Sequence, residues 1–288
     1  MNQTSDKAGT LYVLGTPIGN LQDFSPRAVQ TLQDCDFVAA EDTRVTLKLL
    51  THFQIKKPLT SYFEHNKQQK GEEILDRIAA GETCVLCTDA GMPAISDPGQ
   101  DLVLEAHKRG IPVLSVPGPT AFATALALSG MDSTRFSFEG FLSMNKKERR
   151  EHLESLASDP HTLLFYEAPH KLSRTLKDLY EALGDRRLCI VRELTKIHEE
   201  VIHTDLAQAV KDYPDNNLKG ELVLIVSGCQ KEEQSADLKK GLALANDLVT
   251  AGLSGNEASK IAAKYSNVKK NELYKALQEM KKNEAEKK

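Results

Sequence analysis

Residues 83–91, TCVLCTDAG, decide the fold class, because a short apolar run passes directly into a polar loop that ends in glycine. An apolar run of this length between turn residues is typical of a strand buried in a parallel sheet. The pattern recurs along the first half of the chain. We predict strands over residues 11–15, 36–40, 59–63, 83–88 and 112–116, with helices over 26–35, 66–80 and 98–109. Such alternation predicts parallel βαβ units with helices on both faces of the sheet.

Capping residues support these helices. Ser25 precedes Pro26, which is the favoured order of a cap and a first-turn proline. We expect the helix over 98–109 to start from Asp97 and to end at Gly110.

A second α/β set follows, and a helical segment ends the chain. The second set has predicted strands over 136–139, 162–166, 188–192, 200–203 and 221–227 and helices over 146–158, 171–183 and 205–212. The strands 188–192 and 200–203 leave no room for a helix between them, so we expect an antiparallel pair and a mixed sheet.

Residues 230–237 are polar and are predicted to be a linker, and the chain is purely helical from Leu238 onward. Ser254-Gly-Asn-Glu257 fits a capping box. It precedes an apolar stripe that we expect to be buried, made of Ala258, Ile261, Ala262 and Tyr265. A break at 266–268 separates this helix from a further helix, and two short helices joined by a tight turn resemble a helix-turn-helix.

We therefore predict an α/β protein of three domains: an N-terminal α/β domain over 10–122, a second α/β domain over 123–229, and an all-helical, helix-turn-helix-like domain over 235–288. A helix over about 120–129 is expected to bridge the two α/β domains.

Composition favours an ordinary globular protein, with 40% hydrophobic residues and a net charge of −4. The first ten residues carry no targeting signal, and no apolar run approaches the roughly 20 residues that span a bilayer. We expect a cytoplasmic protein without membrane contact. The negative charge argues against general binding of polyanions, although a basic cluster could touch phosphates or form a solvated helix face; it consists of Lys146, Lys147, Arg149 and Arg150.

The five cysteines predict neither a disulfide framework nor a metal site, because the number is odd and no export signal precedes them. Cys84 and Cys87 have CxxC spacing, but alternation along a strand sends their side chains to opposite faces. We expect no bound metal.

Four loops follow predicted strands and should meet at one edge of the first sheet, where ligands of parallel sheets bind. They cover residues 15–20, 41–44, 89–99 and 117–120. None has the dinucleotide-binding or P-loop pattern, and they lack lysine, so a triphosphate is a poor fit. A ligand held by backbone groups with little countercharge, such as S-adenosylmethionine, fits better.

Eight motifs in order make the chain similar to one family. The motifs are Thr16-Pro-Ile-Gly-Asn20, Ala40-Glu-Asp-Thr-Arg44, Thr88-Asp-Ala-Gly91 with Ile95-Ser-Asp-Pro-Gly99, Val116-Pro-Gly-Pro119, Phe138-Glu-Gly-Phe141, Phe165-Tyr-Glu-Ala-Pro-His170, Arg192-Glu-Leu-Thr-Lys196 and Lys219-Gly-Glu221. Together they resemble the type I ribosomal RNA small-subunit cytidine-2′-O-methyltransferases, a branch of the tetrapyrrole methylase superfamily. The resemblance runs from about Leu11 to Gly228.

The resemblance implies a two-domain tetrapyrrole-methylase-like fold, a homodimer, and S-adenosylmethionine bound in the cleft between domains. The implied substrate is a cytidine 2′-hydroxyl in the decoding region of small-subunit ribosomal RNA, presented by the small ribosomal subunit or its RNA. The predicted cofactor-binding residues are Pro17, Thr88, Asp89, Ala90, Gly91, Ile95, Pro119, Thr120, Tyr166, Ala168, Glu221 and Leu222. One departure is Met92, where many relatives carry threonine.

A ribose hydroxyl is a poor nucleophile, so a proton acceptor is expected near it. The predicted catalytic residues are Glu167 and Glu193, with Asp42 and Asp89 as further candidates, and Glu167 is preferred as base or as an orienter of the ribose. A partner at a helix terminus or in a salt bridge is the alternative role for Glu167. The predicted contacts to RNA are Arg44, Arg192, Lys196, Lys146, Lys147, Arg149 and Arg150. For Arg44 the alternative is pairing with Glu41 or Asp42, and for Arg192, Glu193 and Lys196 it is an ion-pair network.

Two other functions remain open at this point. One is methylation of a tetrapyrrole or another small molecule, against which the helical tail and the Arg192–Lys196 run argue. The other is a nucleic-acid-binding regulator that acts through the C-terminal helices, which would leave most of the chain without a role. Whether those helices contact RNA or the partner subunit is also open.

Overall fold

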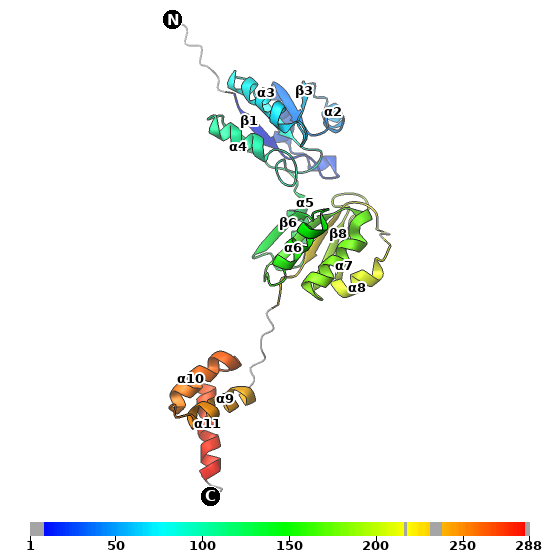
Figure 1. Cartoon of the computed structure of the whole chain (residues 1–288). Coiled ribbons are helices and arrows are strands. Elements are labelled where there is room, and N and C mark those ends of the chain that lie inside the picture. Colours follow the sequence, from blue (N-terminus) through cyan, green and yellow to red (C-terminus); the bar gives the residue numbers. More distant parts are fainter. Residues whose placement is uncertain (1–8, 216–217, 231–237, 286–288) are drawn as a thin grey trace. The chain divides into compact units, whose positions relative to one another are not determined.

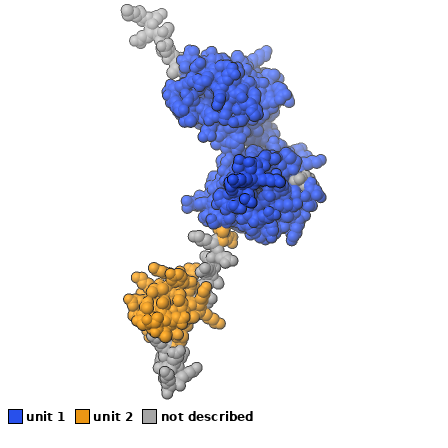
Figure 2. Space-filling model, in the orientation of Figure 1, with its two compact units in different colours: residues 1–228 blue, residues 229–288 orange. Residues whose placement is uncertain are grey.

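The computed structural model describes residues 9–215, 218–230 and 238–285, with the backbone alone for 281–285. The chain forms two compact units, Met1–Gly228 and Cys229–Lys288 (Figure 2). The predicted start of the helical domain, residue 235, lies outside the described residues, as does most of the predicted linker. Among the described helices, none is long and apolar enough to cross a membrane.

The first sheet of the larger unit has five parallel strands in the order β3-β2-β4-β1-β5. Two of them, β1 and β3, are labelled in Figure 1. The strands are β1 (Leu11–Leu14), β2 (Phe37–Ala40), β3 (Leu59–Ser61), β4 (Cys84–Cys87) and β5 (Val113–Val116). Helices α1 (Pro26–Asp34) and α2 (Thr43–His52) contribute to the core on one face, and α3 (Lys67–Ala79) and α4 (Gln100–Lys108) to the core on the other. Cys84 and Cys87 lie in different cores, as the alternation predicted.

Two helices beside this sheet differ from the prediction: α2 was not among the predicted helices, and α4 starts later than expected. Helix α2 begins directly after Asp42, so Arg44 lies in a first helical turn and not in a loop. Helix α4 begins at Gln100 with Gly99 as its cap, so the expectation that Asp97 starts it is wrong. The reason is local backbone geometry: Ala94 and Ser96 have φ values of 66° and 64°, and this turn delays the helix. Ser25 does cap α1, accepting a hydrogen bond from Ala28 N.

The second sheet is mixed, in the order β6-β7-β10-β8-β9, with β6 and β7 parallel and the other pairs antiparallel. Its strands are β6 (Phe136–Phe141), β7 (Thr162–Glu167), β8 (Arg187–Arg192), β9 (Glu200–Asp205) and β10 (Leu222–Val226). The β8–β9 pairing confirms the predicted antiparallel pair.

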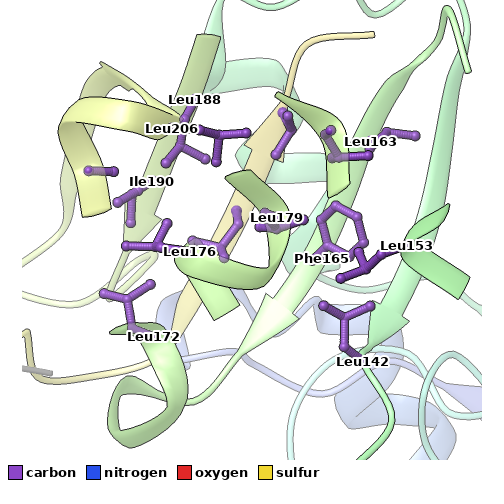
Figure 3. Packing of buried hydrophobic residues seen from close by; sticks show 14 of the residues in the cluster. Leu142, Leu153, Leu163, Phe165, Leu172, Leu176, Leu179, Leu188, Ile190 and Leu206 are labelled. Atoms are coloured by element: carbon purple, nitrogen blue, oxygen red, sulfur yellow. The ribbon is translucent and has the colours of Figure 1, made fainter. Parts of the chain in front are cut away.

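Helices cover both faces of this sheet. On one face lie α6 (Lys146–Ser155), α7 (Leu172–Leu183) and α8 (Leu206–Asp212), over a core that includes Phe165, Leu176 and Ile190 (Figure 3). On the other face lies α5 (Ala121–Ser129), which packs on strands β7, β8 and β10. The chain therefore leaves the first sheet at β5 and packs directly against the second through α5.

The smaller unit consists, in its described part, of helices α9 (Leu238–Thr250), α10 (Gly255–Ser266) and α11 (Lys270–Ala285). Ser254 and Glu257 form the predicted capping box at the start of α10. Ala258 and Ala262 are fully buried, but Tyr265 is 66% exposed, so its place in a buried stripe was wrong. The helix ends one residue later at Ser266, where Asn267 takes a left-handed conformation.

Candidate active site

A cavity of about 380 Å³ lies within the larger unit and takes its lining from both sheets. Its volume falls in the usual range for small-molecule sites, about 300–1,000 Å³. The lining residues are Ile18, Glu41, Thr88, Asp89, Ala90, Gly91, Met92, Ile95, Ser96, Asp97, Thr120, Ala121, Phe141, Tyr166, Glu167, Ala168, Pro169, Val191, Leu194, Glu221, Leu222 and Val223. Within this described set, five residues carry carboxyl groups and none is Lys, Arg or His. The cavity therefore favours a cationic ligand over a phosphate.

The loops after β1, β4 and β5 pack against each other at the carboxyl edge of the first sheet. Thr16 N donates to Gly91 O at 2.9 Å, and Gly91 N donates back to Thr16 O at 3.1 Å. Gly15 and Gly118 approach so closely that a Cβ on Gly15 would lie 2.7 Å from Gly118 Cα. These glycines are therefore required for the contact between the loops after β1 and β5, whereas the two Thr16–Gly91 bonds hold the β4 loop against the β1 loop.

Ten of the twelve residues predicted to bind the cofactor line this cavity: Thr88, Asp89, Ala90, Gly91, Ile95, Thr120, Tyr166, Ala168, Glu221 and Leu222. The other two, Pro17 and Pro119, are not among the lining residues. Both stand next to residues whose backbone joins the loop packing, so their positions follow from that packing.

The side of the cavity formed by the first sheet carries three carboxyl groups. Glu41 accepts a 2.6 Å hydrogen bond from the Thr88 hydroxyl, and Asp89 accepts one of 3.1 Å from Asp42 N. Burial raises the pKa of Asp89, and burial followed by the charges of Glu41 and Asp89 raises the pKa of Asp97 to about 6. In the described part of the chain, no group of His, Cys, Asp or Glu has the arrangement of metal ligands.

The side formed by the second sheet carries Glu167, which is 5% exposed and lines the cavity. Its Oε1 accepts a 2.7 Å hydrogen bond from Ala168 N, and its Oε2 accepts one from the Thr175 hydroxyl. Arg149 donates to the same Thr175 hydroxyl at 2.7 Å and pairs with Asp178 at 2.5 Å. Glu167 thus belongs to a buried network that joins α6 and α7 to the end of β7.

Tyr166 and Phe141 extend this side of the cavity. The Tyr166 hydroxyl accepts a 3.1 Å hydrogen bond from Phe122 N, which ties β7 to the start of α5. Burial raises the pKa of Tyr166. The Phe141 ring lies 5.4 Å from the Tyr166 ring and leaves much of its surface exposed, so it offers an aromatic face at the cavity.

Glu193, the second predicted catalytic residue, does not line the cavity. Its Oε1 accepts hydrogen bonds from Lys196 Nζ at 2.8 Å and from Glu221 N at 3.0 Å. The Lys196 hydrogen bond, followed by the bond from Glu221 N, lowers the pKa of Glu193. A Cβ on Gly220 would lie 2.4 Å from the Glu193 side chain, so glycine is required there. Glu193 therefore holds the loop that brings Glu221 to the cavity.

None of the residues predicted to contact RNA lines the cavity, and one of them is buried. Arg149 is 4% exposed and engaged by Asp178 and Thr175, so its expected contact with RNA does not fit its position. Its neighbours Lys147 and Arg150 are exposed on α6, with side chains 78% and 72% accessible. Lys146 is also exposed.

The other three predicted contacts to RNA are engaged in closer ion pairs than Lys147, which is 3.8 Å from Glu151, and Arg150, which is 3.5 Å from Glu154. Arg44 pairs with Asp42 at 2.6 Å, the alternative foreseen for it, and Arg44 lowers the pKa of Asp42 to about 2. Arg192 pairs with Glu200 at 2.9 Å, and Lys196 pairs with Glu193 and Glu221. Asp42 is not a lining residue, so two of the four candidate proton acceptors, Glu167 and Asp89, face the cavity.

The sequence interpretation assigned no ligand contact to three residues that line the cavity. Glu41 and Asp97 stood inside quoted motifs, but Asp97 was taken for a helix cap and Glu41 for a partner of Arg44. Phe141 closes a quoted motif as well, and it was assigned no role. The signal available for Glu41 and Phe141 was their position just beyond a predicted strand, and for Asp97 it was its place in the loop 89–99 that follows the strand 83–88.

Comparisons with known proteins agree with this geometry. Residues 10–210 match the family model of Tetrapyrrole (Corrin/Porphyrin) Methylases. The chain is 44% identical to ribosomal RNA small subunit methyltransferase I of Synechocystis sp., covering 92% of this chain and 96% of that protein. It is also 44% identical to the protein of the same name from Halalkalibacterium halodurans, with 94% and 96% covered.

Among solved structures, the fold is similar to uroporphyrin-III C-methyltransferase from Thermus thermophilus complexed with S-adenosylhomocysteine. The TM-score is 0.55 at 19% identity, covering 75% of this chain and 97% of that chain.

Proposed function

This chain belongs to the ribosomal RNA small subunit methyltransferase I family, and from that membership we propose that it methylates the 2′-hydroxyl of a cytidine in small-subunit ribosomal RNA with S-adenosylmethionine as donor. The larger unit has the two-domain tetrapyrrole methylase fold. The observation that carries the proposal is identity of 44% over more than nine-tenths of the chain, tail included. A cytoplasmic location accords with a substrate on the ribosome.

The cavity fits the proposed donor. S-adenosylmethionine carries a sulfonium charge, and the lining offers five carboxyl groups with no basic side chain among the described residues. We assign the methionine portion of the donor to the loop that begins at Asp89. The donor would contact Tyr166, Ala168 and Leu222 on the opposite side of the cavity. When bound, the donor supplies an electrophilic methyl group, and the protein holds the acceptor oxygen in line with it.

We assign Glu167 as the group that accepts the ribose proton or orients the ribose. Each carboxylate oxygen can accept more than one hydrogen bond, so the bonds from Ala168 N and Thr175 leave lone pairs for a ribose hydroxyl. Those two bonds fix the carboxylate, as general acid–base catalysis requires. Glu193 stays in a supporting role, because its carboxylate is held by Lys196 and Glu221 N outside the cavity.

The RNA backbone is expected to lie outside the acidic cavity, because phosphates and carboxylates repel each other. The exposed cations of α6, Lys146, Lys147 and Arg150, are suited to phosphate contacts that position the strand. Arg44, Arg192 and Lys196 can reach RNA only in competition with their present acidic partners. A homodimer is also part of this proposal, resting on the family resemblance, and its mass in solution would test it.

The test is transfer of labelled methyl from S-adenosylmethionine to unmodified small ribosomal subunits, with nuclease mapping of the label. Label on a cytidine 2′-oxygen of the decoding region supports the proposal. Binding of the donor without labelling of subunits or RNA would instead point to a small-molecule acceptor, and absence of donor binding would leave a regulator that acts through the C-terminal helices.

Glu167→Gln tests the assignment within that reaction. We expect kcat to fall about 100-fold or more, with donor affinity nearly unchanged, because the amide keeps the shape and loses the basic oxygen. Thermal melting of the variant serves as the control for folding. Unchanged kcat in a folded variant would remove Glu167 from the reaction.

A further inference from the structure

Thr175 is a buried residue of α7 that connects the proposed proton acceptor, Glu167, to a buried arginine. Thr175 is 1% exposed, and it is not among the residues that line the cavity. Its hydroxyl donates to Glu167 Oε2 and accepts a 2.7 Å hydrogen bond from Arg149 Nη2. Arg149 is 4% exposed and pairs in turn with Asp178 at 2.5 Å. A continuous series of hydrogen bonds therefore runs from Asp178 to the carboxylate at the cavity.

The chemistry of arginine fixes the direction of these hydrogen bonds. A guanidinium has donors only and stays protonated in proteins, so Arg149 cannot accept the proton of the Thr175 hydroxyl. A hydroxyl has one proton to donate, and in the structure this proton is directed to Glu167 Oε2. Thr175 thus acts as acceptor toward α6 and as donor toward β7. Any other orientation of the hydroxyl would break the bond to Glu167.

This fixed donor determines the orientation of the Glu167 carboxylate. Oε1 accepts a 2.7 Å hydrogen bond from Ala168 N, and Oε2 accepts the bond from Thr175. The terminal torsion of a glutamate is otherwise broad, so a carboxylate without such donors samples many orientations. Bonds at both oxygens remove this freedom and leave one lone pair on each oxygen for a further hydrogen bond. The ribose hydroxyl would therefore meet an acceptor that is already oriented.

The same network cannot carry a proton away from Glu167. A proton taken up by the carboxylate could pass beyond Thr175 only if the next group had a lone pair to receive it. Arg149 has none, so the network ends there for proton transfer. The proton stays on Glu167 until it leaves through the cavity. The arrangement of Thr175 and Arg149 therefore suits orientation of the acceptor and excludes a proton relay.

We propose that Thr175, held by Arg149, is a positioning residue for methyl transfer, because its hydroxyl fixes the carboxylate of Glu167 toward the ribose. This inference rests on the proposed function and on the role of Glu167 within it. When the ribose oxygen takes the methyl group from the donor sulfur, which keeps the electron pair, the ribose proton passes to Glu167 and Thr175 retains its own. Placement of the acceptor affects the chemical step and leaves donor binding nearly unchanged.

Thr175→Val tests this role, since valine has nearly the shape of threonine and lacks the hydroxyl. We expect kcat for methylation of unmodified small ribosomal subunits to fall roughly 10- to 100-fold, with a change of less than about twofold in the Kd of S-adenosylmethionine. Thr175→Ser keeps the hydroxyl and should retain kcat within about threefold of the wild type. Equal losses of kcat in the valine and serine variants would show that side-chain packing matters and not the hydroxyl, and would contradict the proposal.

Thr162→Val, at the other end of β7, is the matched control. Thr162 is 3% exposed, and its hydroxyl donates to Asp132 O at 2.7 Å, so this variant also loses a buried hydroxyl and its hydrogen bond. Thermal melting should show a similar loss of stability in both valine variants, whereas kcat should fall only in Thr175→Val. Equal losses of kcat in the two would mean that the effect comes from the stability of the second sheet and would overturn the role of Thr175.

A double-mutant cycle with Glu167→Gln separates this inference from the assignment of Glu167. If Thr175 acts through Glu167, Thr175→Val should lower kcat by less than about twofold once residue 167 is already glutamine. Equal fold-losses with and without Glu167→Gln would show that Thr175 acts independently, and would overturn this inference alone. Unchanged kcat in Glu167→Gln would overturn both the inference and the assignment of Glu167. Failure of the wild-type protein to methylate the subunits would overturn the proposed function as well.

Discussion

Both sides of the cavity carry acidic side chains, but the environments of these carboxyl groups differ. On the first-sheet side, Asp89 and Asp97 have raised pKa values, and the cations of the described chain stay out of the cavity lining. On the second-sheet side, Glu167 is fixed by two hydrogen bonds, and outside the cavity lining Glu193 is held by a lysine and a backbone N–H next to Glu221. The carboxyl groups of the first-sheet side can respond to the charge of a ligand, whereas those of the second-sheet side are held in fixed positions.

The difference follows from how each side is built. Loops at the carboxyl ends of parallel strands bring Glu41, Asp89 and Asp97 together, and the partners of Glu41 and Asp89 are the Thr88 hydroxyl and the backbone N–H of Asp42 at the start of α2. The carboxylate of Glu167 lies at the end of a central strand, where α7 and, through Thr175, α6 supply donors. Substitutions on the second-sheet side should therefore lower the free energy of unfolding. Substitutions on the first-sheet side should instead change how the free energy of unfolding depends on pH.

The largest expected effect is on the second side. Arg149→Met should lower the free energy of unfolding by about 3 kcal/mol, because it leaves Asp178 without its closest cation and removes the donor to Thr175. Urea denaturation at neutral pH measures it.

Arg150→Met is the matched control for that variant. It makes the same change one position along α6, at a side chain that is 72% exposed and 3.5 Å from Glu154. Its effect should stay within about 0.5 kcal/mol. If the two variants lose equal stability, the buried network does not hold this side of the cavity.

A smaller effect, of opposite sign, is expected on the first side. Because the pKa of Asp97 in the folded protein is about 6, above its usual value of 3.8, the stability associated with the neutral form is complete below about pH 4 and is lost as pH rises through 6. Asn cannot ionise, so Asp97→Asn should stabilise the ligand-free protein at about pH 8 by about 1–2 kcal/mol, with little change at about pH 5.

Thermal melting at the two pH values measures this gain, which corresponds to an increase in Tm of roughly 2–6 °C. A variant that is less stable at both pH values would mean that Asp97 serves the fold, and the contrast between the two sides would then disappear.

The strands and loops could be predicted from the sequence because apolar runs fix the strands and parallel strands bring their carboxyl ends to one edge. Asp97 could not, since an Asp before a proline is a common helix start, and only the positive φ values of Ala94 and Ser96 reveal that the helix begins later. The burial of Arg149 could not be predicted from the sequence either. In the run Lys146-Lys-Glu-Arg-Arg150 every residue is compatible with solvent, and the partners that draw Arg149 inward belong to α7.

The smallest expected effect concerns the loop that carries Glu221. Lys196 is the first cause of the lowered pKa of Glu193, so their interaction stabilises the fold above the usual pKa of a glutamate and is lost as pH falls and Glu193 takes up a proton. Both side chains are partly accessible to water, so Lys196→Met should cost less than about 1 kcal/mol at about pH 7 and almost nothing at about pH 4. Urea midpoints at the two pH values measure this.

Lys147→Met is the control, since its 3.8 Å pair with Glu151 is highly exposed and should add nothing measurable. If Lys196→Met also changes nothing, the loop is held by the backbone bond from Glu193 N to Glu221 O and by the close packing of Gly220 on Glu193. In that case the second side of the cavity keeps its geometry through backbone contacts at this loop and through charge only at the buried network of Glu167, Thr175 and Arg149.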